Sequence, residues 1–289
     1  MTFPNFFIVG AAKAGTTSMQ QYLHEHPDIH MLGIKEPNFF SHEEIKAQNL
    51  YYKSEDVTLL EEYQSLFEDQ TEPCIGEASV SYLFYQKTAK KIYDYNSGAK
   101  IIIILRNPVS RAYSHYQMDK RLGLVNTPFS EIVNAGSGNE ENKLHYQQYI
   151  ELGMYHEQVQ RYKEVFPEDQ VCILLMEDLI SAPEQTMEKV YGFLNVDSSF
   201  QINNFEQHNN SRSSKNGLIN SLYKSQTLRK GVKAITSNGL RKLIVKVGFN
   251  KGKDEQMDPN TKKHLNTLYK NDIVKLASLI DRNLEHWYE

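Results

Sequence analysis

The stretch FFIVGAAKAGTTS, residues 6–18, predicts a short apolar strand, a loop bounded by two glycines and the start of a helix. Backbone N–H groups at a helix N-terminus, reinforced by the helix dipole, attract anions. Gly10 and Gly15 let the main chain approach such an anion closely. The stretch therefore predicts a phosphate-binding loop between a strand and a helix.

This loop differs from the nucleoside triphosphate motif G-x-x-x-x-G-K-[ST], in which a lysine follows the second glycine and the hydroxyl ligates magnesium. Thr16 takes that lysine position here, and the lysine is Lys13, inside the loop. Thr17 and Ser18 add further hydroxyl donors, so the loop can neutralise a phosphate without a metal ion. The difference points away from ATP. The alternative for this stretch alone is an ordinary strand-to-helix turn with a solvated Lys13.

A second motif, KIIIILRNPVSRAYSHY, spans residues 100–116. Its continuous apolar run is typical of a central parallel strand that is buried on both faces. Arg106 follows at the carboxyl end, where ligands bind in open α/β sheets. An arginine fork and the hydroxyl of Ser114 on the next helix suit a second phosphate. The alternative is that Arg106 forms an ion pair at the strand end while Arg111 and Ser114 face solvent.

Together, in this order and on two strands, the motifs resemble those of sulfotransferases that use 3′-phosphoadenosine 5′-phosphosulfate (PAPS). The resemblance implies an α/β, three-layer, P-loop-like fold with a central, mainly parallel sheet flanked by helices. It also implies transfer of a sulfuryl group to an acceptor hydroxyl, release of the 3′,5′-bisphosphate PAP, and no metal. In that family the first loop holds the 5′-phosphate. The corresponding residues of this sequence are Gly10, Ala12, Lys13, Ala14, Gly15, Thr16, Thr17 and Ser18. Arg106 and Ser114 would hold the 3′-phosphate.

Sulfuryl transfer needs a base for the acceptor proton and a cation for the leaving oxygen. Lys13 is the expected cation. The glycan-modifying branch of the family, which includes the heparan sulfate sulfotransferases, places a catalytic glutamate three residues before a Phe-Phe pair. Glu36 stands at that position before Phe39-Phe40, and it is the expected general base. The alternative is that Glu36 is a surface carboxylate paired with Lys35. The competing candidates for the general base are the histidines near the motifs, which are His30, His42 and His115.

A third block, IGEASVSY at residues 75–82, matches a family segment that often reads Glu-Lys-Thr-Pro or Glu-Ala-Ser-Pro. Ala78 replaces the lysine of the heparan enzymes, which leaves Lys13 and Lys35 to carry positive charge near the sulfuryl group. Glu77 and Ser79, together with Lys35, are the candidate substrate contacts. The structural interpretation is instead a helix cap for Glu77 and a turn position for Ser79.

The acceptor is less defined than the donor. The block around Glu36 favours a carbohydrate or glycolipid hydroxyl, whereas bacterial relatives sulfate hydroxyls on lipids and polyketide-like chains with the same block. Two competing functions are a P-loop phosphotransferase that uses ATP and a non-catalytic protein that binds PAP. A magnesium requirement would favour the phosphotransferase.

Positive charge is concentrated late in the chain, because residues 207–253 contain eleven Lys or Arg and no Asp or Glu, although the whole chain has a net charge of −4. Such a segment raises the local concentration of anions. The family closes a basic loop over the 3′-phosphate near here, which assigns Arg212 and Lys215 to the cofactor. Residues 218–253 are expected to form a basic helical insertion. It could serve as an acceptor-side lid, a peripheral contact with an anionic membrane or a solvated face; nucleic-acid binding is disfavoured.

The composition predicts one sulfotransferase domain over residues 1–289. Asp258-Pro259 caps a C-terminal docking helix over residues 259–288, with a Trp near its end as in heparan-type enzymes. We expect no signal peptide and no membrane span, hence a cytoplasmic protein. Cys74 and Cys172 are expected to be reduced core residues without a disulfide. Oligomeric state is not indicated by the sequence.

Overall fold

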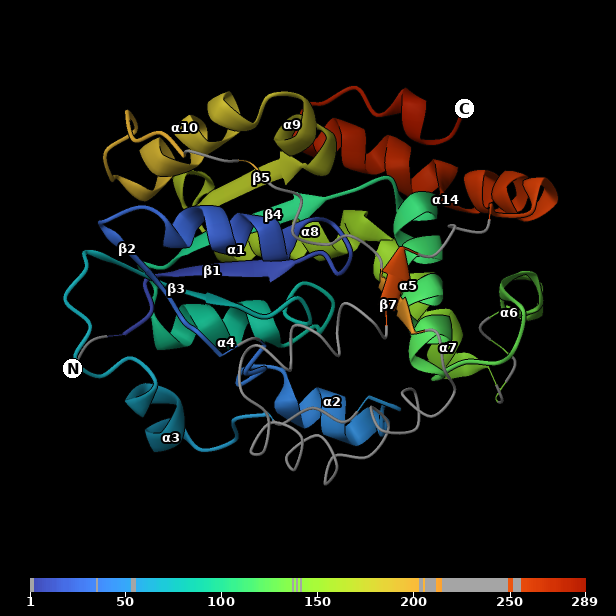
Figure 1. Cartoon of the computed structure of the whole chain (residues 1–289), viewed down its shortest axis with the longest axis horizontal. Helices are drawn as coiled ribbons and strands as arrows, with labels where there is room; N and C mark the ends of the chain where they lie inside the picture. The colour runs from blue at the N-terminus through green and yellow to red at the C-terminus, as the bar shows by residue number, and fades with distance from the viewer. Residues whose placement is uncertain are drawn as a thin grey trace.

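The computed structural model describes residues 3–34, 36–52, 56–136, 138, 140, 142–202, 205, 212–214, 249–251 and 256–289. Its centre is a five-stranded, all-parallel sheet in the order β2-β3-β1-β4-β5 (Figure 1). The strands are β1 (Phe6–Gly10), β2 (Ile29–Met31), β3 (Cys74–Ala78), β4 (Lys100–Leu105) and β5 (Val171–Leu175). The predicted α/β fold with a parallel central sheet is confirmed.

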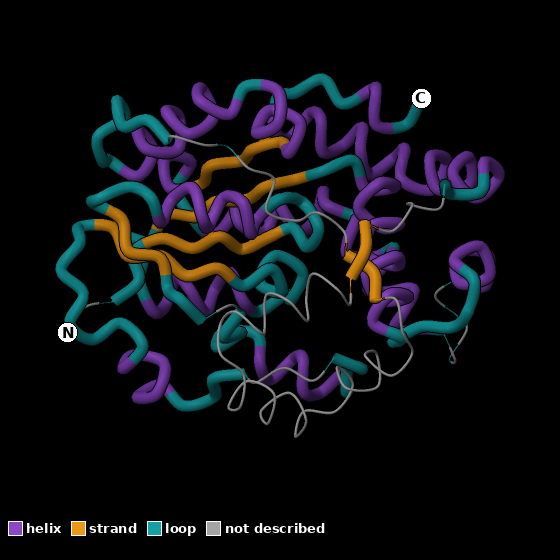
Figure 2. Tube along the Cα trace, in the orientation of Figure 1, coloured by secondary structure: helices purple, strands orange, loops and turns teal. Residues whose placement is uncertain are grey.

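Helices surround this sheet (Figure 2). They are α1 (Thr16–His24), α2 (His42–Gln48), α3 (Leu60–Ser65), α4 (Thr88–Tyr95), α5 (Pro108–Leu122), α6 (Phe129–Ala135), α7 (Lys143–Tyr149), α8 (Tyr155–Val165), α9 (Met176–Ser181), α10 (Pro183–Leu194) and α14 (Pro259–Ile280). Every residue of β1 and β3 is buried, and so are Ile101–Leu105 of β4. Because successive strand residues point to opposite faces, both faces of the sheet must be covered. The continuous apolar run at residues 101–105 has this physical cause.

The register between β1 and β4 explains how the strand becomes a loop. Phe6, Phe7 and Ile8 pair in step with residues 100–102 of β4, but the register shifts between Ile8 and Gly10. Ala11 N–H then donates to Ile104 O at 2.7 Å, so β4 still holds the chain after the strand has ended. The loop that follows is therefore fixed to the sheet at its carboxyl edge.

The C-terminal segment, predicted to be a docking helix, contains helix α14. The Asp258 side chain accepts a hydrogen bond from the Thr261 N–H at 2.8 Å, and Pro259 occupies the first turn. Its buried stripe consists of Leu265, Tyr269, Ile273 and Leu276, all 0% exposed. This stripe packs against α8 and α5. The helix ends at Ile280 rather than near residue 288, and a short 3₁₀ turn at Glu285–Trp287 completes the segment.

Two further expectations concern the cysteines and the basic segment. Cys74 and Cys172 are buried free thiols, as predicted. The expected basic insertion, residues 218–253, lies outside the described residues except for β7 (Phe249–Lys251). β7 is a strand where a helix was expected, and it pairs antiparallel with β6 (Arg212–Ser214). In the described part of the chain, no helix is long and apolar enough to cross a membrane.

Docking of α14 yields a testable consequence for stability. Ile273→Ala should lower the free energy of unfolding by about 2–5 kcal/mol, because it removes a fully buried side chain and leaves a cavity. Val274→Ala, its neighbour on the exposed side at 48% exposure, is the matched control and should change stability by no more than about 0.5 kcal/mol. Denaturant titration measures both, and equal losses would show that the helix is not docked by this stripe.

Candidate functional site

The predicted phosphate loop has the geometry of an anion site. It joins β1 to α1, and Gly15 caps the helix with φ 90°, a left-handed conformation that favours glycine. The first N–H groups of a helix have no partner within the helix. In addition, the first turn of α1, all of it described, contains no acidic side chain that would neutralise the positive end of its dipole. The loop and α1 therefore fit a bound phosphate group.

Gly10 is required by close packing at the start of this loop. A Cβ atom at Gly10 would lie 2.7 Å from the Leu83 Cβ atom, which is too close for any side chain. Leu83 is fixed there because its N–H donates to Val9 O at 2.8 Å. The turn that follows β3 thus packs directly on the beginning of the phosphate loop.

Arg106 reaches the same loop from β4. Its Nη1 donates to the Lys13 carbonyl oxygen at 3.1 Å, across 93 residues of sequence. The Tyr155 hydroxyl donates to Arg106 O at 3.0 Å and fixes the backbone at this point. Burial lowers the pKa of the Arg106 guanidinium from its ordinary value, which still leaves it protonated. The two motifs predicted to bind two phosphates therefore meet at one edge of the sheet.

Ser114 lies on α5, which starts directly after Arg106. Asn107 caps this helix by accepting from the Ser110 N–H at 3.0 Å. Ser114 is partly exposed, and one turn later the Met118 sulfur lies 3.5 Å from the Lys13 Nζ. Lys13 thus extends toward the α5 face that carries Ser114. Joint binding of a 3′-phosphate by Arg106 and Ser114 stays a prediction.

Glu36 is held at the end of β3. Its N–H donates to Ala78 O at 3.2 Å, and its backbone has φ 55°. Two residues later, the Asn38 N–H donates to the Ser79 hydroxyl at 3.1 Å. Because β3 pairs with β1 through Ala78 and Ile8, the segment with Glu36 lies at the same carboxyl edge as the phosphate loop. The Glu36 side chain is partly exposed, as a base that meets a substrate requires.

Glu77 and Ser79 do not lie where the predicted substrate contacts would need them. Both are 0% exposed, and the Ser79 hydroxyl donates to Glu77 Oε1 at 2.6 Å. The Tyr63 and Tyr82 hydroxyls donate to Glu77 Oε2 at 2.8 and 3.0 Å. Burial raises the Glu77 pKa to about 7. This placement gives Glu77 and Ser79 a structural role beneath the site, and it corrects the expectation of acceptor contact.

Three predicted basic residues cannot be placed as side chains. Lys35 and Lys215 lie outside the described residues. Arg212 is described only as the first residue of β6. Their assignments to acceptor and cofactor stay predictions.

A C-terminal clamp on the site was missed by the sequence reasoning. The Trp287 indole donates to Glu177 Oε1 at 2.6 Å, and Arg282 forms a bidentate pair with Asp178 at 2.9 and 3.0 Å. Asn107, the cap of α5, donates from Nδ2 to Trp287 O at 2.9 Å. Helix α9 carries both acidic residues, Glu177 and Asp178, in its first turn. It thereby holds the chain end against the strand-to-helix junction that presents Arg106.

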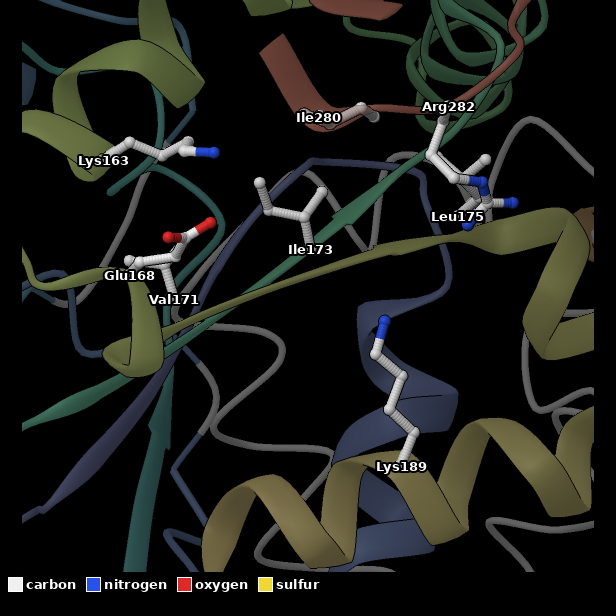
Figure 3. Close-up of a pocket in the computed structure, with 8 residues that line it drawn as sticks. All are labelled: Lys163, Glu168, Val171, Ile173, Leu175, Lys189, Ile280 and Arg282. Atoms are coloured by element: carbon white, nitrogen blue, oxygen red, sulfur yellow. The ribbon is translucent and has the colours of Figure 1, made fainter.

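A cavity of about 190 Å³ lies elsewhere, along the edge strand β5 (Figure 3). Lys189 extends from α10 toward β5, and Lys163 and Arg282 lie at the rim. None of the eight residues that line it belongs to the predicted site. Charged side chains are a usual protection of an edge strand against pairing with another chain. The phosphate loop and Arg106, which do not line this cavity, therefore stay the predicted site.

The family described as "Sulfotransferase domain" matches residues 3–278 of the chain. Carbohydrate sulfotransferase 15 of Rattus norvegicus is 27% identical over 245 residues, which cover 67% of this chain and 44% of that protein. Bifunctional heparan sulfate N-deacetylase/N-sulfotransferase 1 of Mus musculus is 30% identical over 203 residues, 68% of this chain and 22% of that protein. The chain thus spans less than half the length of these curated relatives.

Among solved structures, a sulfotransferase from Alicyclobacillus acidocaldarius superimposes with a TM-score of 0.74 and 30% sequence identity. That alignment covers 100% of both chains. The similarity therefore extends over the whole fold, including the C-terminal helix that follows the basic segment.

Buried Glu77 predicts a pH dependence of stability. The folded pKa of about 7 lies above the ordinary value of 4.5, so between these pH values the folded protein holds a proton that the unfolded chain has released. Stability should then fall by about 1.4 kcal/mol per pH unit as pH rises through this window, and level off above it. Glu77→Gln should flatten the curve in denaturant titrations at pH 4.5–8; an unchanged slope would contradict the assignment.

Proposed function

The chain belongs to the sulfotransferase domain family, and on that premise we propose that it moves a sulfuryl group from PAPS to an acceptor hydroxyl and releases PAP. The observation that carries the proposal is the hydrogen bond from Arg106 to the Lys13 carbonyl. This bond joins Arg106, which directly follows β4, to the phosphate loop that contains Lys13. A donor with phosphates at both the 3′ and 5′ positions matches this pair of sites.

The donor is proposed to bind along the carboxyl edge of the sheet. Backbone N–H groups at the start of α1, with the hydroxyls of Thr16 and Thr17, would hold the 5′-phosphate. The Arg106 guanidinium and the Ser114 hydroxyl would hold the 3′-phosphate. PAPS supplies the activated sulfuryl group, and the chain supplies the position and charge around it.

Glu36 and Lys13 are proposed to act on opposite sides of the transferred group. The acceptor oxygen attacks sulfur in line, the bond from sulfur to the 5′-phosphate oxygen breaks, and the acceptor proton passes to the Glu36 carboxylate. The Lys13 ammonium stabilises the negative charge that develops on the leaving phosphate oxygen. The placement of Glu36 at the end of β3, beside the strand that feeds the phosphate loop, supports these roles.

A carbohydrate or glycolipid hydroxyl is the proposed acceptor. Similarity to a carbohydrate sulfotransferase and to a heparan sulfate N-sulfotransferase supports a glycan, as does the glutamate before Phe39-Phe40. A lipid or polyketide-like hydroxyl is the second candidate. An acceptor screen with radiolabelled PAPS distinguishes them, because only acceptors of the correct class become labelled.

Arg106→Ala tests the donor site. The substitution should weaken PAP binding by about 1.5–3 kcal/mol, the range for a hydrogen bond to a charged group, and weaken AMP binding less, because AMP lacks the 3′-phosphate. Calorimetric titration with PAP, AMP and ATP, with and without magnesium, measures both effects. Equal affinity of the wild type for PAP and AMP would refute the 3′-phosphate site, and a magnesium-dependent preference for ATP would favour a phosphotransferase.

Glu36→Gln tests the base. Turnover should fall by about 10²–10⁴-fold, the usual contribution of a general base, while PAP affinity stays the same. Glu43→Gln on α2 is the matched control, since its exposed carboxylate pairs with Lys91 and should not affect turnover. Undiminished turnover of Glu36→Gln would remove Glu36 as the base.

A further inference from the structure

A buried polar cluster on α5 lies outside the proposed chemistry. Asp119 is 0% exposed, and its Oδ2 atom accepts from three tyrosine hydroxyls. Tyr51 and Tyr149 lie at 2.8 Å, and Tyr52 lies at 2.5 Å. The cluster therefore joins three parts of the chain: the segment after α2, helix α5 and helix α7.

His115, one turn before Asp119, extends the cluster. Its ring is 4% exposed, and its Nδ1 lies 3.0 Å from the Gln148 carbonyl oxygen. A carbonyl oxygen can only accept, so Nδ1 carries a hydrogen. Arg111 Nη1 lies farther from this nitrogen, at 3.5 Å. The other ring nitrogen, Nε2, lies 2.8 Å from the Tyr52 hydroxyl oxygen.

The hydrogens in this cluster do not suffice for its contacts. Asp119 has contacts with three hydroxyls, Tyr52 also has one with His115, and the Tyr51 and Tyr52 hydroxyls lie 3.2 Å apart, which makes five contacts of hydrogen-bond length. The hydroxyls supply only three hydrogens. With an ionised Asp119 and a neutral His115, Tyr52 would meet two acceptors with one hydrogen. A separation of 2.5 Å between two oxygens lies at the short end of the range for hydrogen bonds, so this contact needs a hydrogen.

We propose that Asp119, Tyr52 and His115 share one additional proton. The Asp119 acid donates to the Tyr52 oxygen, and the Tyr52 hydroxyl donates to His115 Nε2. Each of the four contacts at 2.8 Å or less then has its hydrogen, and only the longer one between Tyr51 and Tyr52, at 3.2 Å, has none. Shifting both hydrogens by one step gives an ionised Asp119 and a protonated His115, with the same number of protons.

The surrounding charges place the proton on the aspartate side. Burial lowers the pKa of His115 well below its ordinary value, and the cations Arg111 and Lys13 lower it further. Burial raises the pKa of Asp119, although its hydroxyl partners act in the opposite direction. The titratable and charged groups that face the trio are Arg111 on α5, Lys13 in the phosphate loop, Tyr51 in the segment after α2, and His145 and Tyr149 on α7.

The shared proton makes the hydrogen bonds between the segment at Tyr51 and Tyr52 and helix α5 dependent on pH. Without it, Tyr52 can satisfy only one of its two partners, and the segment at Tyr51 and Tyr52 loses one of its bonds to α5. The inference does not rest on the proposed function, since it follows from the hydrogen count alone. It does concern the site, because α5 also carries Ser114 and contacts Lys13 through Met118.

The sign of the effect follows from counting protons in both states. Above about pH 6.5 the unfolded chain holds no proton on Asp119 or on His115 Nε2, whereas the folded trio holds one. The folding equilibrium constant should therefore fall about tenfold per pH unit until the folded trio releases its proton. Between about pH 4 and 6.5 the unfolded histidine holds one proton, so the trio contributes no slope.

Asp119→Asn is the first test, since an amide cannot ionise or share the proton at any pH of the titration, while its oxygen can still accept from tyrosine hydroxyls. In denaturant titrations at about pH 6.5–9, the ratio of the wild-type folding constant to that of Asp119→Asn should fall about tenfold per pH unit. The variant should be more stable than Asp119→Ala at pH 7, because it keeps an oxygen that accepts from tyrosine hydroxyls. Glu77 contributes equally to both proteins and cancels in the comparison. Parallel pH curves, with Asp119→Asn as unstable as Asp119→Ala, would overturn the shared proton.

A second measurement uses the folded wild type, so it does not depend on the variant folding. Carbon-13 NMR of labelled aspartate carboxyls should show one resonance of the protonated form at pH 7; an entirely ionised set would refute the proposal. Tyr52→Phe should also remove the slope. Its matched control, Tyr85→Phe, removes a hydroxyl bonded to Gln48 outside the cluster and should keep the slope. An equal slope of the folding constant against pH in both variants would show that Tyr52 does not share the proton with Asp119 and His115.

Discussion

The end of β1 is held from both sides, and the rest of the site depends on this constraint. Ala11 N–H donates to Ile104 O of β4, while Ile8 O and Val9 O accept from Ser79 and Leu83 after β3. A strand fixed in this way can end in a tight loop without fraying, because its backbone groups stay paired. The phosphate loop, the strand end that presents Arg106 and the segment that presents Glu36 are then adjacent by the topology of a parallel sheet.

Two buried carboxyl groups near the site, those of Glu77 and Asp119, are both stabilised by hydrogen bonds to hydroxyl groups. Glu77 accepts from two tyrosines and a serine, and Asp119 is in hydrogen-bond contact with three tyrosine hydroxyls. A buried carboxylate without such partners would cost several kcal/mol. Tyrosine suits the task because its ring packs in the core while its hydroxyl donates a hydrogen bond. Many of the aromatic residues near the site therefore serve polar cores and not substrate stacking.

Local sequence patterns predicted the elements that depend on local physics. The glycine-bounded loop, the apolar strand at residues 101–105 and the capped helix at Pro259 all have signals within a few residues. The burial of Glu77 has no such signal, because a strand covered on both faces leaves neither set of alternating residues exposed. The clamp between Trp287 and Glu177 and the bond between Tyr51 and Asp119 join residues 110 and 68 positions apart. Only the tertiary structure specifies such pairs.

Helix α5 connects the phosphate loop with the buried polar cluster, because two of its faces contact different parts of the protein. Ser114 and Met118, four residues apart, face the phosphate loop, whereas Arg111, His115 and Asp119 repeat at the same spacing on a neighbouring face. The Arg111 guanidinium donates to carbonyls of α7, so this second face is bonded to the protein along its length. A helix is stiff over such distances. A change in protonation on one face therefore concerns the same helix that carries Ser114, the residue proposed to bind the 3′-phosphate.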